Sequence, residues 1–154
     1  MDTTAPRRFD IALSFPGEPH RPYVAEVAAH LAKEFGEDRI LYDKYHDAEF
    51  ARSDLITYLP ELYRTESELI VIFLCQEYPT KSWCKREWRH INQLIDTADA
   101  DRIMFLSFGN PGDLSSIGIL SGDGYIDLSE LPAQTAAEKI IKRLGINQGN
   151  KPVQ

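Results

Sequence analysis

The sequence feature that most constrains the fold is the unbroken apolar run at residues 69–75, Leu-Ile-Val-Ile-Phe-Leu-Cys. A strand with one solvated face alternates apolar and polar residues, whereas a strand covered on both faces is apolar throughout. The run is far shorter than the roughly 20 residues that a helix needs to cross a bilayer. It therefore predicts a central strand in a parallel sheet, with helices packed on both sides.

Other β-type segments alternate with helical patterns along the rest of the chain. The expected strands are residues 9–15, 39–43, 69–75, 103–108 and 124–128. The expected helices are residues 22–35, 54–64 and 83–95, followed by a last helix with Ala137, Ile140, Ile141 and Leu144 on one face. Residues 113–120 are expected to form a loop or a weak helix. Pro60 should kink the helix at 54–64 or begin a second short one, and Gly145 should end the last helix.

Five strands alternating with helices in a chain of 154 residues predict one α/β domain with right-handed crossovers. At this size we expect a flavodoxin-like three-layer sandwich with a five-stranded parallel sheet in the order 2-1-3-4-5. Such sheets bind ligands at the carboxyl ends of their strands. The residues expected there are 14–17, Asp43, residues 75–77 and the helix that begins at Trp83.

Composition excludes several function classes. The net charge is −7 and no basic stripe occurs, which argues against direct nucleic-acid binding. Residues 1–8 are polar and lack an apolar signal core, so we expect a cytoplasmic protein with no membrane segment. The two cysteines form no C-x-x-C pair and the four histidines lack ligand spacing, so no metal is expected.

Most familiar catalytic motifs are absent from the sequence. It contains no G-x-G-x-x-G, no P-loop lysine, no G-x-S-x-G elbow and no acid cluster of a receiver domain. What remains is the segment at 82–88, where Glu87 shares a helix face with Trp83 and Cys84. Glu87 is then either a carboxylate in a cleft walled by an indole or a solvated residue beside a core tryptophan. Asp43 likewise either serves a site or caps a turn.

Several short segments, taken in order, form a recognisable pattern. They are residues 9–15 with Gly17-Glu18, Tyr42-Asp43, Asp54-Leu55, Ser82-Trp83-Cys84 with Glu87, and residues 124–128. With these segments the chain resembles the TIR (Toll/interleukin receptor) domain, in the bacterial form placed at the N-terminus of longer proteins. The resemblance covers residues 9–144, and it leads us to expect a polar tail at 1–8, the domain at 9–145, and a tail or linker at 146–154.

The resemblance implies an NAD⁺ glycohydrolase, with NAD⁺ as substrate and no cofactor. Enzymatic members use an essential glutamate on the third helix, and Glu87 is the matching position. By the same resemblance, aromatic side chains shape the nicotinamide pocket and polar ones hydrogen-bond the substrate. The substrate-binding candidates are Ser14, Phe15, Tyr42, Asp43, Trp83 and Cys84.

Residues 44–52 match the BB loop of the family, which often docks on a neighbouring copy and completes the site there. The resemblance therefore implies activation by self-association, together with a sensor domain and a role in antiphage defence by NAD⁺ depletion. Many relatives carry Trp-Gly in this loop, where this chain has Ala51-Arg52. Pro60 is a second departure, because that helix is usually uninterrupted.

Three alternatives remain open. The first is a non-catalytic adaptor that acts through contacts between TIR domains. The second is a TIR domain that binds a nucleotide without turning it over. The third is an enzyme similar to nucleoside deoxyribosyltransferases, which also use a glutamate on a related fold. The presence of Glu87 beside Trp83 and Cys84 favours the NAD⁺ glycohydrolase over the adaptor. The matches at residues 14–17 and at Tyr42-Asp43 favour a TIR domain over the deoxyribosyltransferase-like enzyme.

Overall fold

The computed structural model describes residues 7–14, 20–74, 102–109 and 124–149. The predicted helix at 83–95 and the segment at 113–120 lie outside these ranges. The elements are β1 (Phe9–Ser14), α1 (Arg21–Phe35), the 3₁₀ turn η2 (Glu37–Arg39), β2 (Ile40–Leu41), the 3₁₀ turn η3 (Asp43–Tyr45), α2 (Asp47–Phe50), α3 (Leu55–Glu66), β3 (Ser67–Leu74), β4 (Ile103–Ser107), β5 (Ile126–Asp127) and α5 (Ala133–Asn147).

The five strands form one parallel sheet in the order β2-β1-β3-β4-β5, as predicted. Strand β3 lies at the centre, where Ile70 pairs with Ala12 of β1 on one side and Ile103 of β4 on the other. All of its residues except Glu68 are buried. The apolar run therefore occupies the position that its composition predicted.

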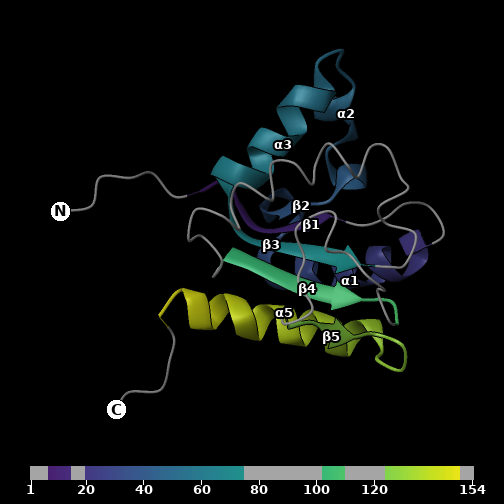
Figure 1. The fold of residues 1–154 in the computed structure, drawn as a ribbon. Helices are drawn as coiled ribbons and strands as arrows, with labels where there is room; N and C mark the ends of the chain where they lie inside the picture. Colours follow the sequence, from purple (N-terminus) through teal and green to yellow (C-terminus); the bar gives the residue numbers. More distant parts are fainter. Residues whose placement is uncertain (1–6, 15–19, 75–101, 110–123, 150–154) are drawn as a thin grey trace.

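Helices cover both faces of the sheet, which makes the three layers visible in Figure 1. On one face, α1 and α5 pack side by side, and Leu31 and Ile140 are fully buried against strand residues such as Phe73. On the other face, α2 and α3 supply Phe50 and Leu62, which pack against Ile70 and its neighbours. The alternation of β3 side chains between these two clusters explains why the whole strand is apolar.

Helix α1 begins and ends where its sequence signals predict. Pro22 is its second residue, a position where a missing backbone N–H costs no helical hydrogen bond. Gly36 follows its last turn with φ +93°, a conformation that side chains with a Cβ disfavour, and its N–H donates to the carbonyl of Ala32 at 2.7 Å.

Several predicted boundaries differ from the structure, including β5, which is Ile126–Asp127 where residues 124–128 were expected. Three differences have a clear physical reason. Strand β2 is two residues long, because the chain turns into η3 directly after Tyr42. Residues 55–66 form a single helix, so Pro60 does not begin a second one. A proline inside a helix removes one hydrogen bond, and buried Leu62 and Tyr63 hold the following turn against the sheet.

The third difference is at the end of α5, which runs past Gly145 to Asn147. Leu144 is buried just before this glycine, and Arg143 donates to the carbonyl of Ile103 at 3.0 Å. These contacts offset the cost of a glycine inside a helix, about 1 kcal/mol. The glycine with positive φ is instead Gly149, two residues beyond the helix, at +86°.

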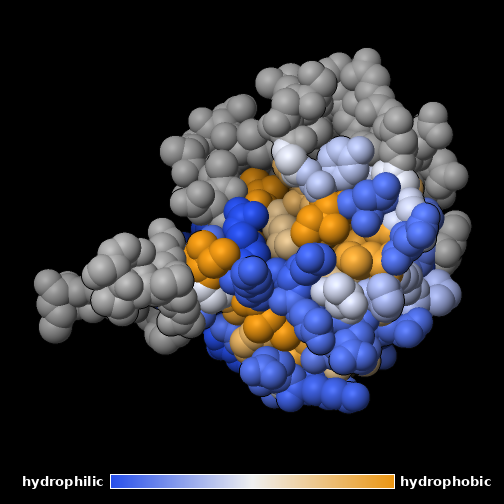
Figure 2. Space-filling model, turned by 90° about the horizontal axis from the view of Figure 1, so that it is seen from below, coloured by the Kyte–Doolittle hydropathy of each residue, from blue (hydrophilic) through white to orange (hydrophobic). Residues whose placement is uncertain are grey.

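The face covered by α5 mixes hydrophilic and apolar side chains (Figure 2). Of the described large apolar side chains, those of Tyr125 and Ile146 are exposed, at 46% and 42%. None of the helices in the described part of the chain is both long and apolar enough to cross a bilayer.

Candidate functional site

The candidate site begins at the carboxyl edge of the sheet, where β1 and β2 end side by side. Ala12 pairs with Leu41, the last residue of β2. Ser14 ends β1 two residues later, and Asp43 opens η3 two residues after Leu41. Ser14 is 1% exposed and ends β1, and Tyr42 directly follows β2. Three predicted site residues, Ser14, Tyr42 and Asp43, therefore lie at the carboxyl ends of β1 and β2.

Arg21, in the first turn of α1, holds the end of β2. Its two terminal nitrogens donate to the two carboxylate oxygens of Asp43 at 2.9 and 3.0 Å. One of them also donates to the hydroxyl of Tyr42 at 3.1 Å. Fork-to-fork pairing of this kind fixes the orientation of a carboxylate as well as its charge.

The ring of Tyr42 faces inward. Its side chain is 4% exposed and belongs to the core cluster on the α1 side. It meets Tyr45 edge-on, with 5.1 Å between ring centroids. Tyr42 therefore joins the core to the sheet edge, and its hydroxyl is the group that reaches Arg21.

Residues 43–50 fold within the single chain, as η3 and α2. Nε2 of buried His46 lies 2.8 Å from the carbonyl oxygen of Ile40, and its ring packs edge-on against Phe9. Because a carbonyl only accepts, Nε2 carries the proton. The resemblance predicted a loop at residues 44–52, whereas the structure has short helical turns there. Burial of Phe50 against the sheet explains why this part of the segment is ordered.

Glu49 anchors the far end of this segment. Arg8 binds its carboxylate with both terminal nitrogens, one of them at 2.6 Å, and Tyr58 donates its hydroxyl to the same group. The hydrogen bonds from Arg8 are the main cause that lowers the pKa of Glu49 to about 2. Arg52 lies over the Tyr58 ring, 3.7 Å from its centroid, and pairs with Asp54.

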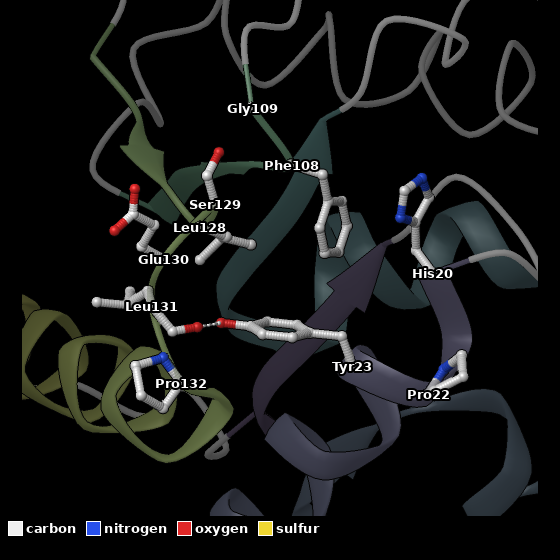
Figure 3. Close-up of a pocket in the computed structure, with 10 residues that line it drawn as sticks. All are labelled: His20, Pro22, Tyr23, Phe108, Gly109, Leu128, Ser129, Glu130, Leu131 and Pro132. Atoms are coloured by element: carbon white, nitrogen blue, oxygen red, sulfur yellow. Dashed lines mark hydrogen bonds between the residues drawn. The ribbon is translucent and has the colours of Figure 1, made fainter.

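A hollow of about 610 Å³ opens at the same carboxyl edge, beyond the ends of β4 and β5 (Figure 3). His20 stacks on Phe108 with 4.1 Å between ring centroids, and Tyr23 donates to the carbonyl of Leu131 at 2.7 Å. None of the described residues that line it is a lysine or arginine, and Glu130 adds a carboxylate. The described lining of this hollow is therefore mainly aromatic and apolar, with one carboxylate from Glu130.

The first turn of α1 and its N-cap residue His20 thus contribute side chains both at the end of β2 and beside β4 and β5. Arg21 reaches the end of β2, whereas His20 and Tyr23 wall the hollow beside β4 and β5. Within the described ranges, no three His, Cys, Asp or Glu side chains come close enough together to hold a metal ion.

Comparison with protein families adds the decisive observation. The family model described as TIR domain matches residues 11–144, from the middle of β1 to the last buried turn of α5. This chain belongs to the TIR domain family. No curated protein sequence matches it.

The TIR match encloses all the predicted site residues, but the structure describes only part of them. Ser14, Tyr42 and Asp43 are described, whereas Phe15, Trp83, Cys84 and Glu87 lie outside the described residues. The roles of these seven residues remain predictions.

Sequence reasoning missed Arg21, which contacts two of the described TIR candidates. A signal for it was present in the sequence. An arginine stands beside the proline that starts α1, and an aspartate follows β2, so both groups belong to the carboxyl edge of a parallel sheet.

Proposed function

We propose that this TIR domain is an NAD⁺ glycohydrolase, which cleaves the bond between nicotinamide and ribose and releases nicotinamide with ADP-ribose or a cyclic isomer. The observation that carries the proposal is the family match over residues 11–144, because it includes Glu87. Glu87 is the position that corresponds to the essential glutamate of enzymatic TIR domains.

The chemistry requires little of the protein beyond one carboxylate. Nicotinamide in NAD⁺ is already a cationic leaving group, so no acid has to protonate it. The transition state resembles an oxocarbenium ion, and a fixed negative charge beside the ribose stabilises positive charge that develops only there. We assign this role to Glu87, which also binds the ribose hydroxyls in this proposal.

Residues from neighbouring segments complete the proposed site. Ser14 and Asp43 hydrogen-bond the substrate, and Tyr42 shapes the pocket from the end of β2. Phe15, Trp83 and Cys84 form its aromatic and apolar wall. The gathering of Ser14, Tyr42 and Asp43 at one edge of the sheet supports this assignment. NAD⁺ is the substrate, and the reaction uses no separate cofactor.

We propose that self-association of the TIR domains activates NAD⁺ cleavage. TIR domains self-associate, and in this proposal residues 44–52 dock on a neighbouring copy. Because residues 43–50 already fold in one chain, the neighbour contributes groups to the site and is not needed to order this segment. We further propose a bacterial, cytoplasmic effector whose residues 146–154 lead to a sensor domain and which depletes NAD⁺ in antiphage defence.

The test is nicotinamide release from NAD⁺ by the chain held in a forced oligomer. We expect turnover by the wild type, loss of at least a thousandfold in Glu87→Ala, and normal turnover in Glu138→Ala, an exposed acid on α5. Equal turnover in wild type and Glu87→Ala would remove Glu87 from the mechanism. No turnover by any of the three oligomers, with folding intact, would favour the adaptor.

A further inference from the structure

The contact between Arg21 and Asp43 joins the start of α1 to the first residue of η3. Both carboxylate oxygens of Asp43 accept from the guanidinium, at 2.9 and 3.0 Å. The Arg21 side chain is 18% exposed and that of Asp43 is 44% exposed. The cation is therefore largely enclosed, while the carboxylate still faces the edge of the sheet.

This geometry leaves Asp43 able to bind a second partner. Two carboxylate oxygens offer about four lone-pair sites, and the guanidinium uses one on each oxygen. The remaining sites can accept hydrogen bonds from hydroxyl groups, while the fork fixes the plane of the carboxylate. A carboxylate held in this way binds a hydroxyl without first losing its own rotational freedom.

Arg21 also contacts the residue before the segment that follows β2. It holds the Tyr42 hydroxyl at 3.1 Å, and the next residue, Asp43, opens η3. At the far end of the segment, Arg8 holds Glu49. Residues 43–49 are therefore fixed at two points by two arginines that come from outside the segment.

We propose that Arg21 is a positioning residue for substrate binding: it orients the carboxylate of Asp43 and the segment at 43–49 at the carboxyl edge of the sheet. The proposal rests on the NAD⁺ glycohydrolase function proposed above. Arg21 acts through Asp43 and Tyr42, and it does not touch the reacting atoms.

The pair Arg39–Asp10 provides a matched control. Arg39 precedes β2 and binds both oxygens of Asp10 near the start of β1, at 2.9 and 2.8 Å. It makes the same fork-to-fork contact at the amino edge, where it joins η2, just before β2, to β1. Its loss should weaken the fold without changing substrate binding.

The kinetic test compares the KM for NAD⁺ in forced oligomers of both sets of variants. We expect Arg21→Gln and Asp43→Asn each to raise KM about tenfold, and the double variant to raise it no further, because the two groups act as a unit. Arg21→Lys keeps the positive charge but cannot make the two-pronged contact, so its KM should lie between those of wild type and Arg21→Gln. Arg39→Gln and Asp10→Asn should leave KM within about twofold, since a merely structural loss lowers the active fraction and not the affinity.

A second readout does not depend on activity. Amide hydrogen exchange in residues 43–50 should be faster in Arg21→Gln than in wild type, and unchanged in Arg39→Gln. Unchanged exchange in Arg21→Gln, or a KM equal to that of wild type, would overturn the positioning role. If exchange accelerates but the wild-type oligomer releases no nicotinamide, the anchoring of the segment stands and the proposed enzyme function is the part that fails.

Discussion

The carboxyl and amino edges of the sheet carry ion pairs of nearly identical geometry. Arg21 meets Asp43 at 2.9 and 3.0 Å, and Arg39 meets Asp10 at 2.9 and 2.8 Å. Their surroundings differ, because Asp10 is 15% exposed and Asp43 is 44% exposed. The same pair of residue types thus closes the fold at one edge and presents a carboxylate at the other.

Other contacts at each edge follow the same division. At the amino edge, Arg39 also donates to the carbonyl of Arg7, and Arg102 donates to the carbonyls of Arg64 and Ser67 at 2.8 and 2.7 Å. These guanidinium groups satisfy backbone acceptors. At the carboxyl edge, the hollow walled by His20 and Phe108 opens beside the strands. We infer that the amino edge serves stability and the carboxyl edge serves binding.

The largest effect is expected from the strand that connects both edges. Phe73 of β3 is fully buried and stacks on Phe108, with 5.8 Å between ring centroids. Phe73→Ala should lower the free energy of unfolding by about 3–5 kcal/mol, against roughly 1 kcal/mol for Phe73→Leu. Chemical denaturation measures both values. Loss of one edge while the other stays folded, seen by hydrogen exchange, would contradict a shared core.

The two arginines should differ in what they stabilise. Arg39→Gln removes a fork onto a mostly buried carboxylate and a bond to a carbonyl, so we expect a loss of about 1–2 kcal/mol. Arg21→Gln should cost less, about 1 kcal/mol, because Asp43 keeps much of its hydration. Urea midpoints of the two variants give the comparison. A larger loss of stability in Arg21→Gln than in Arg39→Gln would contradict the claim that the amino-edge pair contributes more to stability.

The smallest effect concerns the far end of the segment at 43–49 and depends on pH. The pKa of Glu49 is about 2 in the folded chain, below its ordinary value of 4.5, mainly because Arg8 binds the carboxylate. A lowered pKa stabilises the fold above pH 4.5, and this contribution disappears as the pH falls from 4.5 to 2. The carboxylate is 24% exposed and Arg8 40%, so solvent screening limits the contribution to about 1 kcal/mol.

Glu49→Gln should therefore lower the melting temperature at pH 7 by a few degrees. The difference from wild type should shrink as the pH falls through the Glu49 pKa of about 2, because the wild-type carboxylate then becomes protonated and loses the charge that the glutamine lacks. Thermal melts followed by circular dichroism from pH 7 down to 2 measure it. A difference that is the same at every pH would mean that the ion pair with Arg8 contributes nothing.

The sheet could be predicted from sequence because its three central strands, β1, β3 and β4, are largely apolar and are separated by helical patterns. Residues 69–75 predicted the central strand, and the alternation with helices predicted a parallel α/β sheet. The order 2-1-3-4-5 followed from the flavodoxin-like fold expected at this chain length. Boundaries failed where tertiary contacts outweigh local signals. Gly145 stays helical because Leu144 and Arg143 hold the last turn of α5 against the sheet.

The candidate site could be predicted only as a neighbourhood. The parallel topology placed Ser14, Tyr42 and Asp43 at one edge, as expected from the ends of their strands. The parallel topology places both Arg21 and Asp43 at the carboxyl edge, but they lie 22 positions apart, and no local pattern specifies that their side chains pair. The inward orientation of the Tyr42 ring also depends on the packing of α1, which the spacing of residues does not specify.

The most direct test of the account is a titration of NAD⁺ into ¹⁵N-labelled Glu87→Gln, followed by NMR. This isosteric variant should bind the substrate without cleaving it. We predict chemical-shift changes at the carboxyl edge, at Ser14, Tyr42 and Asp43, and none at Asp10 and Arg39 of the amino edge. Saturable changes at the amino edge alone, or none anywhere at millimolar NAD⁺ in the forced oligomer, would contradict the account.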